Sequence, residues 1–188
     1  MIVVKISKTK WNVVSPIYNY FKNNNEVNIT AIFCNKAGAG VFERGERLGV
    51  KSVLFSKDDF VNSNQVINQL KELKTDFVVL AGFLWLVPAN LVAAFPNKII
   101  NIHPALLPKY GGKGMYGMNV HDAVVANKET ETGITIHLVN EEYDKGAILL
   151  QARCPVSETD SAEDVAHKIH KLEYQYFPVV VDFVIKNL

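Results

Sequence analysis

The chain has 188 residues, 48% of them hydrophobic, and its 20 Lys and Arg residues are nearly balanced by 19 Asp and Glu residues. That length suits one domain spanning residues 1–188 and is sufficient to bury a substantial core. The near-zero net charge argues against nucleic acid and membrane surfaces as partners and favours small-molecule ligands.

The N-terminal segment and the two cysteines indicate the compartment. The first apolar run, Met-Ile-Val-Val, is quickly followed by Lys5, unlike a signal peptide, and no apolar run approaches the roughly 18 residues of a membrane-spanning helix. Cys34 and Cys154 lie far apart without metal-ligand spacing, so we expect buried free thiols and no metal site. We therefore expect a cytoplasmic protein.

The first hundred residues alternate short Val- and Ile-rich runs with helical patterns. Ser15 followed by Pro16, and Val87 followed by Pro88, are typical of helix starts, because the first helical position needs no N–H donor. The alternation predicts βαβ units and a parallel sheet. The expected strands are residues 2–6, 29–34, 52–55, 77–81 and 98–102, and the expected helices are residues 16–23, 41–48, 63–73 and 88–95.

The second half of the chain has a different pattern. After a glycine-rich loop we expect a helix over residues 120–127, two antiparallel strands over 133–139 and 147–153, and a long helix over 161–186 interrupted by Pro178. The predicted fold class is therefore α/β, with a Rossmann-like, mostly parallel central sheet, helices on both faces, and a C-terminal antiparallel strand pair followed by a long helix.

The stretch from residue 98 to residue 117 carries the best candidates for chemistry. Asn101 and His103 are two residues apart in a strand, so their side chains point to the same face. Pro104 ends the strand, and a glycine-rich loop follows. Because ligands of open parallel sheets bind at the carboxyl ends of strands, we expect a ligand site there.

The remaining histidines give weaker signals. His137 is expected to be structural or to support the site. His121, His167 and His170 are expected to face solvent, although His170 and Glu173 are three residues apart on one helix face.

The run Asn101-Ile-His-Pro-Ala-Leu-Leu-Pro108 resembles the signature of the folate-dependent formyltransferases, and the resemblance covers about residues 29 to 188. It implies transfer of a formyl group from 10-formyltetrahydrofolate, as co-substrate, to an amine. The resemblance is strongest to the branch of the family that acts on glycinamide ribonucleotide in purine synthesis. It implies that residues 1–100 form a nucleotide-binding-like half and that residues 101–188 form the catalytic and folate-binding half. Further matching segments are residues 80–83, 133–137, 144–146 and 148–151, together with Glu173.

By this resemblance Asn101, His103 and Asp144 are the catalytic residues. The chemistry is consistent with these residue types, because amine attack on a formyl carbon makes its oxygen negative and fixed donors stabilise that oxygen. An imidazole exchanges protons near neutral pH, and a nearby carboxylate favours its protonated form. From local sequence alone, Asp144 in Glu-Tyr-Asp-Lys-Gly also reads as a turn residue.

The resemblance also implies two sets of binding residues. The expected substrate-binding residues are Ser7, Asn12, Gly82, Ile102, Pro104 and Glu173. The expected folate-binding residues are Leu84, Trp85, Leu86, Val87, Val139 and Asn140.

The first strand-to-helix turn departs from the family pattern Ser-Gly-x-Gly-Ser/Thr-Asn, whose backbone N–H groups hold a phosphate. Ser7 and Asn12 keep their places, but Lys8 and Lys10 stand where glycines are expected, and Trp11 replaces a small hydroxyl residue. Three interpretations stay open: a weakened or inactive enzyme that still binds folate, a different amine substrate, or an altered N-terminal segment in an otherwise ordinary enzyme.

Other branches of the same chemistry are the sugar-amine and methionyl-tRNA formyltransferases and the formyltetrahydrofolate hydrolase. The tRNA-directed enzyme carries an extra C-terminal domain and the hydrolase an extra N-terminal one, and we expect neither in 188 residues. We expect small-molecule substrates and a monomer or homodimer.

Overall fold

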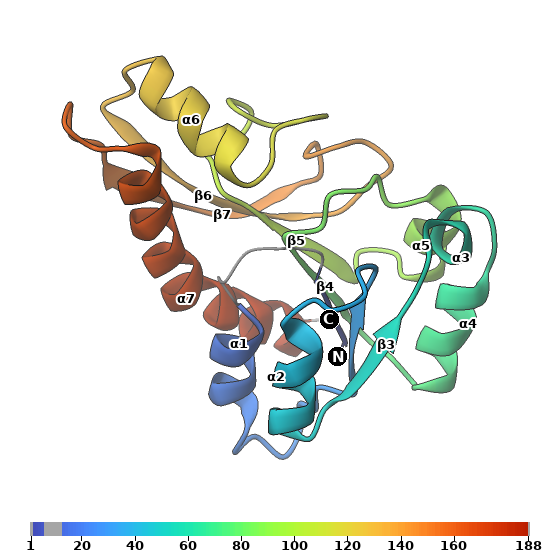
Figure 1. The fold of residues 1–188 in the computed structure, drawn as a ribbon. Coiled ribbons are helices and arrows are strands. Elements are labelled where there is room, and N and C mark those ends of the chain that lie inside the picture. The colour runs from blue at the N-terminus through green and yellow to red at the C-terminus, as the bar shows by residue number, and fades with distance from the viewer. Residues whose placement is uncertain (1, 6–12, 188) are drawn as a thin grey trace.

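A single seven-stranded sheet organises the molecule (Figure 1). The computed structural model describes residues 2–5 and 13–187. The strand order is β3-β2-β1-β4-β5-β6-β7; the first five of these strands are mutually parallel, whereas β6 runs antiparallel to both β5 and β7. The strands are β1 (Ile2–Lys5), β2 (Ala31–Cys34), β3 (Lys51–Leu54), β4 (Val78–Ala81), β5 (Ile99–His103), β6 (Glu131–Leu138) and β7 (Ile148–Pro155).

Helices cover both faces of the sheet (Figure 1). Residues of α1, α2, α6 and α7 share one apolar core with the sheet, and residues of α3, α4 and α5 share a second core on the opposite face. Every residue of β2 and β4 is buried, as expected for central parallel strands covered on both sides. The helices are α1 (Val14–Phe21), α2 (Val41–Leu48), α3 (Lys57–Val61), α4 (Gln65–Glu72), α5 (Ala89–Ala94), α6 (Met118–Ala126) and α7 (Ala162–Lys186).

The fold class expected from the sequence is confirmed, but the expected start of α1 was wrong. This helix begins at Val14, so Ser15 is not its cap and Pro16 is its third residue. A proline is tolerated there because the first N–H groups of a helix have no intrahelical partner. Pro88 was expected to be the first residue of α5, but it is the cap residue that precedes the helix, which begins at Ala89.

Two further differences concern helices. Pro178 does not interrupt α7, which is continuous from Ala162 to Lys186. Pro178 is buried beside Phe177 and Val181, so burial of this face offsets the missing backbone hydrogen bond. The sequence also missed α3, a five-residue helix started by a reciprocal capping box between Ser56 and Asp59.

The topology determines where polar side chains gather. The chain builds β2 and β3 on one side of β1 and β4 to β7 on the other, so a topological switch point lies between β1 and β4. The antiparallel pairing of β5 with β6 places Asn101 opposite His137 and His103 opposite Thr135. Functional groups from two strands are thereby brought to the same edge of the sheet.

Candidate active site

A cavity of about 1040 Å³ lies at the carboxyl edge of the sheet. Its wall includes residues that follow β2 and β4, the end of β5, the glycine-rich loop, and parts of α6 and α7. A small recess of about 40 Å³ opens beside it, and Asn101, Tyr143 and Asp144 line both spaces. Polar groups of β5 and of the β6–β7 loop therefore line both spaces.

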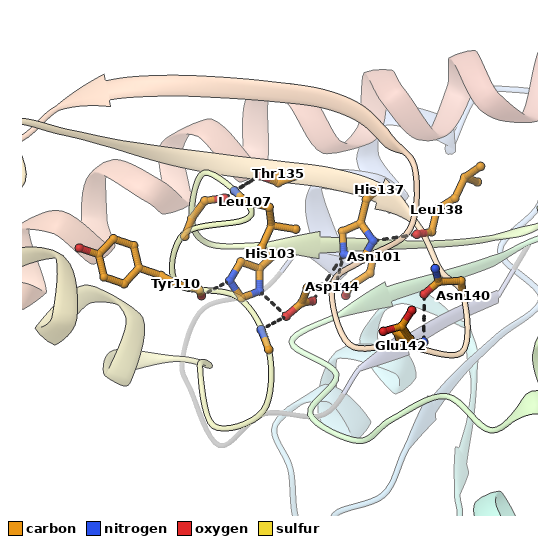
Figure 2. A network of polar contacts seen from close by, with 12 residues as sticks. Asn101, His103, Leu107, Tyr110, Thr135, His137, Leu138, Asn140, Glu142 and Asp144 are labelled. Atoms are coloured by element: carbon orange, nitrogen blue, oxygen red, sulfur yellow. Dashed lines mark hydrogen bonds and ion pairs between the residues drawn. The ribbon is translucent and has the colours of Figure 1, made fainter.

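The carboxamide of Asn101 is held by the ring of His137. The Asn101 Nδ2 atom lies 3.1 Å from His137 Nε2, and His137 Nδ1 lies 2.7 Å from the carbonyl oxygen of Leu138 (Figure 2). Because a carbonyl only accepts, Nδ1 carries the proton and Nε2 accepts from Asn101. The second amide hydrogen of Asn101 is left for a ligand, and its buried Oδ1 has no hydrogen-bond partner among the described residues.

The imidazole of His103 lies between Tyr110 and Asp144 (Figure 2). Its Nε2 donates to the backbone carbonyl of Tyr110 at 2.7 Å, and its Nδ1 lies 3.6 Å from Asp144 Oδ2. The same carboxylate oxygen accepts the N–H of Gly112 at 2.8 Å, and Asp144 Oδ1 lies 3.6 Å from His137 Nε2. Asp144 therefore sits between both rings, on a backbone with φ of 54°.

Burial sets the protonation of this cluster. Desolvation lowers the pKa of His103 below 6.5, although Asp144 and the Tyr110 carbonyl act in the opposite direction. Asp144 thus favours the protonated ring, as expected from the sequence, but burial is the larger effect and the net shift of the His103 pKa is downward. For Asp144, burial would raise the pKa, but the His137 ring, His103 and the Gly112 N–H together lower it below 3.8.

The expected binding residues divide between the two spaces. Ser7 and Asn12 lie outside the described residues. Those that line the cavity are Gly82, Leu84, Trp85, Ile102, Pro104 and Glu173. Those that line the recess are Trp85, Leu86, Val87, Val139 and Asn140.

Trp85 is supported by an aromatic cluster. Its ring lies edge-on to Phe55 with centroids 6.0 Å apart, and near Phe60 and Phe83 at 6.0 and 6.3 Å. Phe55 and Phe60 are buried. The cluster forms a rigid apolar wall where cavity and recess meet, as small-molecule pockets require.

Two histidines expected in solvent line the cavity instead. His121 is 3% exposed, and its buried Nδ1 has no hydrogen-bond partner in the described part of the chain. Burial, then the neighbouring His170 and His103, lower the pKa of His121 to about 4. His170 Nδ1 lies 2.8 Å from Glu173 Oε2, so the three-residue spacing on α7 does produce a pair.

These histidines were missed because their burial depends on how α6 packs against α7. A local signal existed for His121, which lies three residues before Val124 and so shares its buried face. Phe83, Tyr143 and Gly112 also line the site.

The described residues contain neither a metal-binding group of side chains nor a membrane-spanning helix. No group of three or more His, Cys, Asp and Glu side chains is arranged to hold a metal ion within residues 2–5 and 13–187. No helix in the same ranges has the length and apolar character needed to cross a membrane.

Comparisons with known proteins agree on one family. The sequence profile described as formyl transferase matches residues 1–181. A chloroplastic phosphoribosylglycinamide formyltransferase of Arabidopsis thaliana is 40% identical over 158 residues, which are 81% of this chain and 54% of the plant protein. The phosphoribosylglycinamide formyltransferase of Escherichia coli (strain K12) is 31% identical over 186 residues, covering 97% of this chain and 85% of that protein.

Solved structures give the same result. The crystal structure of phosphoribosylglycinamide formyltransferase from Anaplasma phagocytophilum has a TM-score of 0.87 and 27% identity, covering 99% of this chain and 87% of that chain. The protein from Streptococcus pneumoniae TIGR4 has a TM-score of 0.79 and 30% identity, covering 98% of both chains.

An open, mostly parallel sheet covered by helices on both faces defines an α/β protein of the doubly wound class, with its ligand site at the carboxyl edge. Within that class, the chain belongs to the formyl transferase family. It spans about half the length of the plant relatives, 54% in Arabidopsis thaliana and 51% in Vigna unguiculata.

Proposed function

We propose that this protein transfers a formyl group from 10-formyltetrahydrofolate to the amino group of glycinamide ribonucleotide in de novo purine biosynthesis. The observation that carries the proposal is the gathering of Asn101, His103 and Asp144 on one wall, where the cavity meets the recess. Relatives named for this activity, at 31–40% identity, support it.

In this proposal Asn101 stabilises the oxygen that becomes negative when the amine attacks the formyl carbon. His137 fixes one amide hydrogen of Asn101, and the other donates to that oxygen. A fixed donor of this kind contributes about 2.7–4 kcal/mol to transition-state stabilisation.

His103 accepts the proton that the attacking amine loses as its new C–N bond forms, and returns that proton to the folate nitrogen as the formyl C–N bond to the folate breaks and tetrahydrofolate leaves. Its Nε2 is engaged by the Tyr110 carbonyl, so Nδ1 is the basic atom. The pKa below 6.5 keeps Nδ1 free near neutral pH, and Asp144 at 3.6 Å stabilises the imidazolium that forms. Asp144 itself is oriented by the Gly112 N–H.

The two spaces suit the two substrates. Trp85, Leu86 and Val87 give the recess an apolar wall for the folate ring system, with Val139 and Asn140 opposite. The unpartnered Oδ1 of Asn101 offers an acceptor to a ligand N–H. Glu173, 9% exposed, offers a carboxylate to the end of the other substrate that carries the amine, with Gly82, Ile102 and Pro104 along the same cavity.

A second candidate is folate binding without turnover, or transfer to a different amine. It is favoured by Lys8 and Lys10, which replace the two glycines of the phosphate-binding turn. Side chains there would obstruct the close backbone approach that a phosphate nest needs. The cytoplasmic location and the monomeric or dimeric state stay predictions from the sequence.

The experiment is a steady-state assay with 10-formyltetrahydrofolate and glycinamide ribonucleotide, followed by calorimetric titration with a folate analogue and then with the ribonucleotide. Formylated ribonucleotide as product supports the proposal. Binding of the analogue alone, without product, would favour the non-catalytic candidate. The same assay on a Lys8→Gly/Lys10→Gly variant tests the turn directly, because restored turnover would attribute the defect to these side chains.

A further inference from the structure

The loop after β5 is fastened at a point remote from the cavity. Glu129 precedes β6, and its Oε1 accepts hydrogen bonds from the Tyr110 hydroxyl at 2.8 Å and from Lys109 Nζ at 2.9 Å. The Glu129 side chain is 22% exposed and that of Lys109 is 69% exposed. The Tyr110–Glu129 bond is thus the more sheltered of the two, and the ion pair with Lys109 adds little.

Tyr110 has an uncommon backbone conformation. Its φ is 56°, in the left-handed region that a non-glycine residue adopts only at a cost of about 1–2 kcal/mol. In this conformation its carbonyl accepts from His103 Nε2 at 2.7 Å (Figure 2). Strain of this kind persists where surrounding contacts hold it, and it is frequently found at functional sites.

The two ends of Tyr110 therefore have different partners. The hydroxyl donates to Glu129 and also interacts with the Asn127 side chain, and the carbonyl accepts from the imidazole of His103. Glu129 is itself fixed by its backbone N–H, which donates to Val124 of α6 at 3.2 Å. Three hydrogen bonds thus connect the end of α6, through Glu129 and Tyr110, to the ring of His103.

We propose that Glu129 is a positioning residue: it holds Tyr110 so that the Tyr110 carbonyl fixes the orientation and tautomer of the His103 imidazole. The effect of Glu129 on turnover rests on the proposed function. The effect of Glu129 on the His103 ring does not, because it can be measured in the protein without substrates. With Nε2 held as the donor, Nδ1 is left as the base that faces Asp144.

The charged and titratable groups around His103 come from several elements. Asp144 and the Tyr110 carbonyl raise its pKa, whereas burial and His137 lower it. Glu173 on α7 raises it, and His121 on α6 also lies within electrostatic range. Variants at Glu129 or at the Tyr110 hydroxyl leave all of these groups in place, so a change in the ring reports on the position of the Tyr110 carbonyl.

The test uses the variants Tyr110→Phe and Glu129→Ala and the double variant. Loss of one hydrogen bond of ordinary strength predicts that kcat falls about fivefold in each single variant, with KM within about twofold. Because both changes remove the Tyr110–Glu129 hydrogen bond, the double variant should lose no more than the more impaired of the two single variants. Glu129→Gln, which keeps an acceptor for the hydroxyl, should recover most of kcat.

Two controls separate positioning from general damage. Glu131 lies two residues after Glu129 in the sequence and forms an exposed ion pair with Arg153. Glu131→Ala removes this ion pair and should leave kcat unchanged. Lys109→Ala removes the other partner of Glu129 and should change kcat by less than about twofold.

A second readout does not depend on turnover. An NMR titration of the His103 imidazole in the free protein should show a lower pKa in Tyr110→Phe and Glu129→Ala than in the wild type, because the ring loses an acceptor for its proton. The Glu131→Ala titration should match the wild type.

The outcomes are distinct. Unchanged His103 titration in both variants would overturn the positioning role, as would multiplicative losses of kcat in the double variant. A drop in kcat with Glu129→Ala but not with Tyr110→Phe would also overturn it, because the effect would then pass through Lys109. If the wild type formylates no amine, the proposed function fails, and the titration still decides whether Glu129 positions the ring.

Discussion

Replacing Asp144 by Asn is the change that most directly perturbs the electrostatics of the site. The amide keeps the size and one acceptor for the Gly112 N–H, but it loses the negative charge 3.6 Å from His103 Nδ1. Both side chains are largely shielded, at 5% exposed for His103 and 14% for Asp144. The charge therefore acts through a medium of low effective dielectric constant.

The size of the effect follows from that distance. Two unit charges at 3.6 Å attract by about 4–5 kcal/mol at an effective dielectric constant near 20. Water and the remaining amide dipole offset about half of it, leaving about 2.3 kcal/mol, or about fiftyfold in rate. Asp144→Asn should therefore lower kcat about fiftyfold.

The variant should also change how kcat depends on pH, in a direction that follows from the His103 pKa. The carboxylate raises the pKa of His103, so its loss lowers that pKa further below 6.5. In the proposed mechanism the neutral ring is the base, so activity should fall as the pH drops through this pKa, and the acid limb of the kcat profile should move to lower pH in the variant. Initial rates between pH 5 and 8 measure both effects. A profile with an unmoved acid limb and near-normal kcat would refute the role of Asp144.

Three further predictions concern the fold and the recess. The pKa of His121 in the folded protein is about 4, below 6.5, so its stabilising contribution is complete above pH 6.5 and is lost as the pH falls. That loss lowers the free energy of unfolding by about 3 kcal/mol between pH 6.5 and pH 4. In urea unfolding, the His121→Leu variant should not show this part of the pH dependence; identical pH dependence in both proteins would contradict this. Gly146→Ala places a Cβ 1.7 Å from the Leu138 carbonyl oxygen. It should destabilise the protein by about 2 kcal/mol in thermal unfolding, whereas Gly40→Ala, whose Cβ would make only an ordinary contact with the Arg44 side chain at 3.8 Å, should not; equal melting temperatures would refute the clash. Trp85→Ala should weaken binding of a folate analogue by at least about tenfold, and unchanged affinity would remove Trp85 from the recess wall.

Much of the fold was readable because local periodicity and burial coincide. The helix expected over residues 41–48 is observed as Val41–Leu48, where the apolar stripe and the closing Gly49 are both local. The two-residue spacing of Asn101 and His103 likewise fixed their common face before any tertiary information. Strand boundaries differed by one or two residues, as pairing partners rather than propensity decide where a ladder ends.

What was missed depends on contacts between distant segments. α3 has only five residues and no period, so its capping box was its only signal. The burial of His121 and the partial burial of His170 arise where α6 meets α7, and neither helix shows this alone. The contact between Tyr110 and Glu129 joins residues 19 apart through a turn whose conformation no local pattern specifies.

The central claim is that Asn101 and His103 act directly on a formyl group that moves to an amine. It is tested by initial rates of formyl transfer from 10-formyltetrahydrofolate to glycinamide ribonucleotide in the wild type, Asn101→Ala and His103→Ala, with folate-analogue affinity measured in parallel. The account predicts formylated ribonucleotide from the wild type and a loss of at least about a hundredfold in each variant, while analogue affinity is retained. Near-normal turnover in either variant, or no formylated product from the wild type, would contradict it.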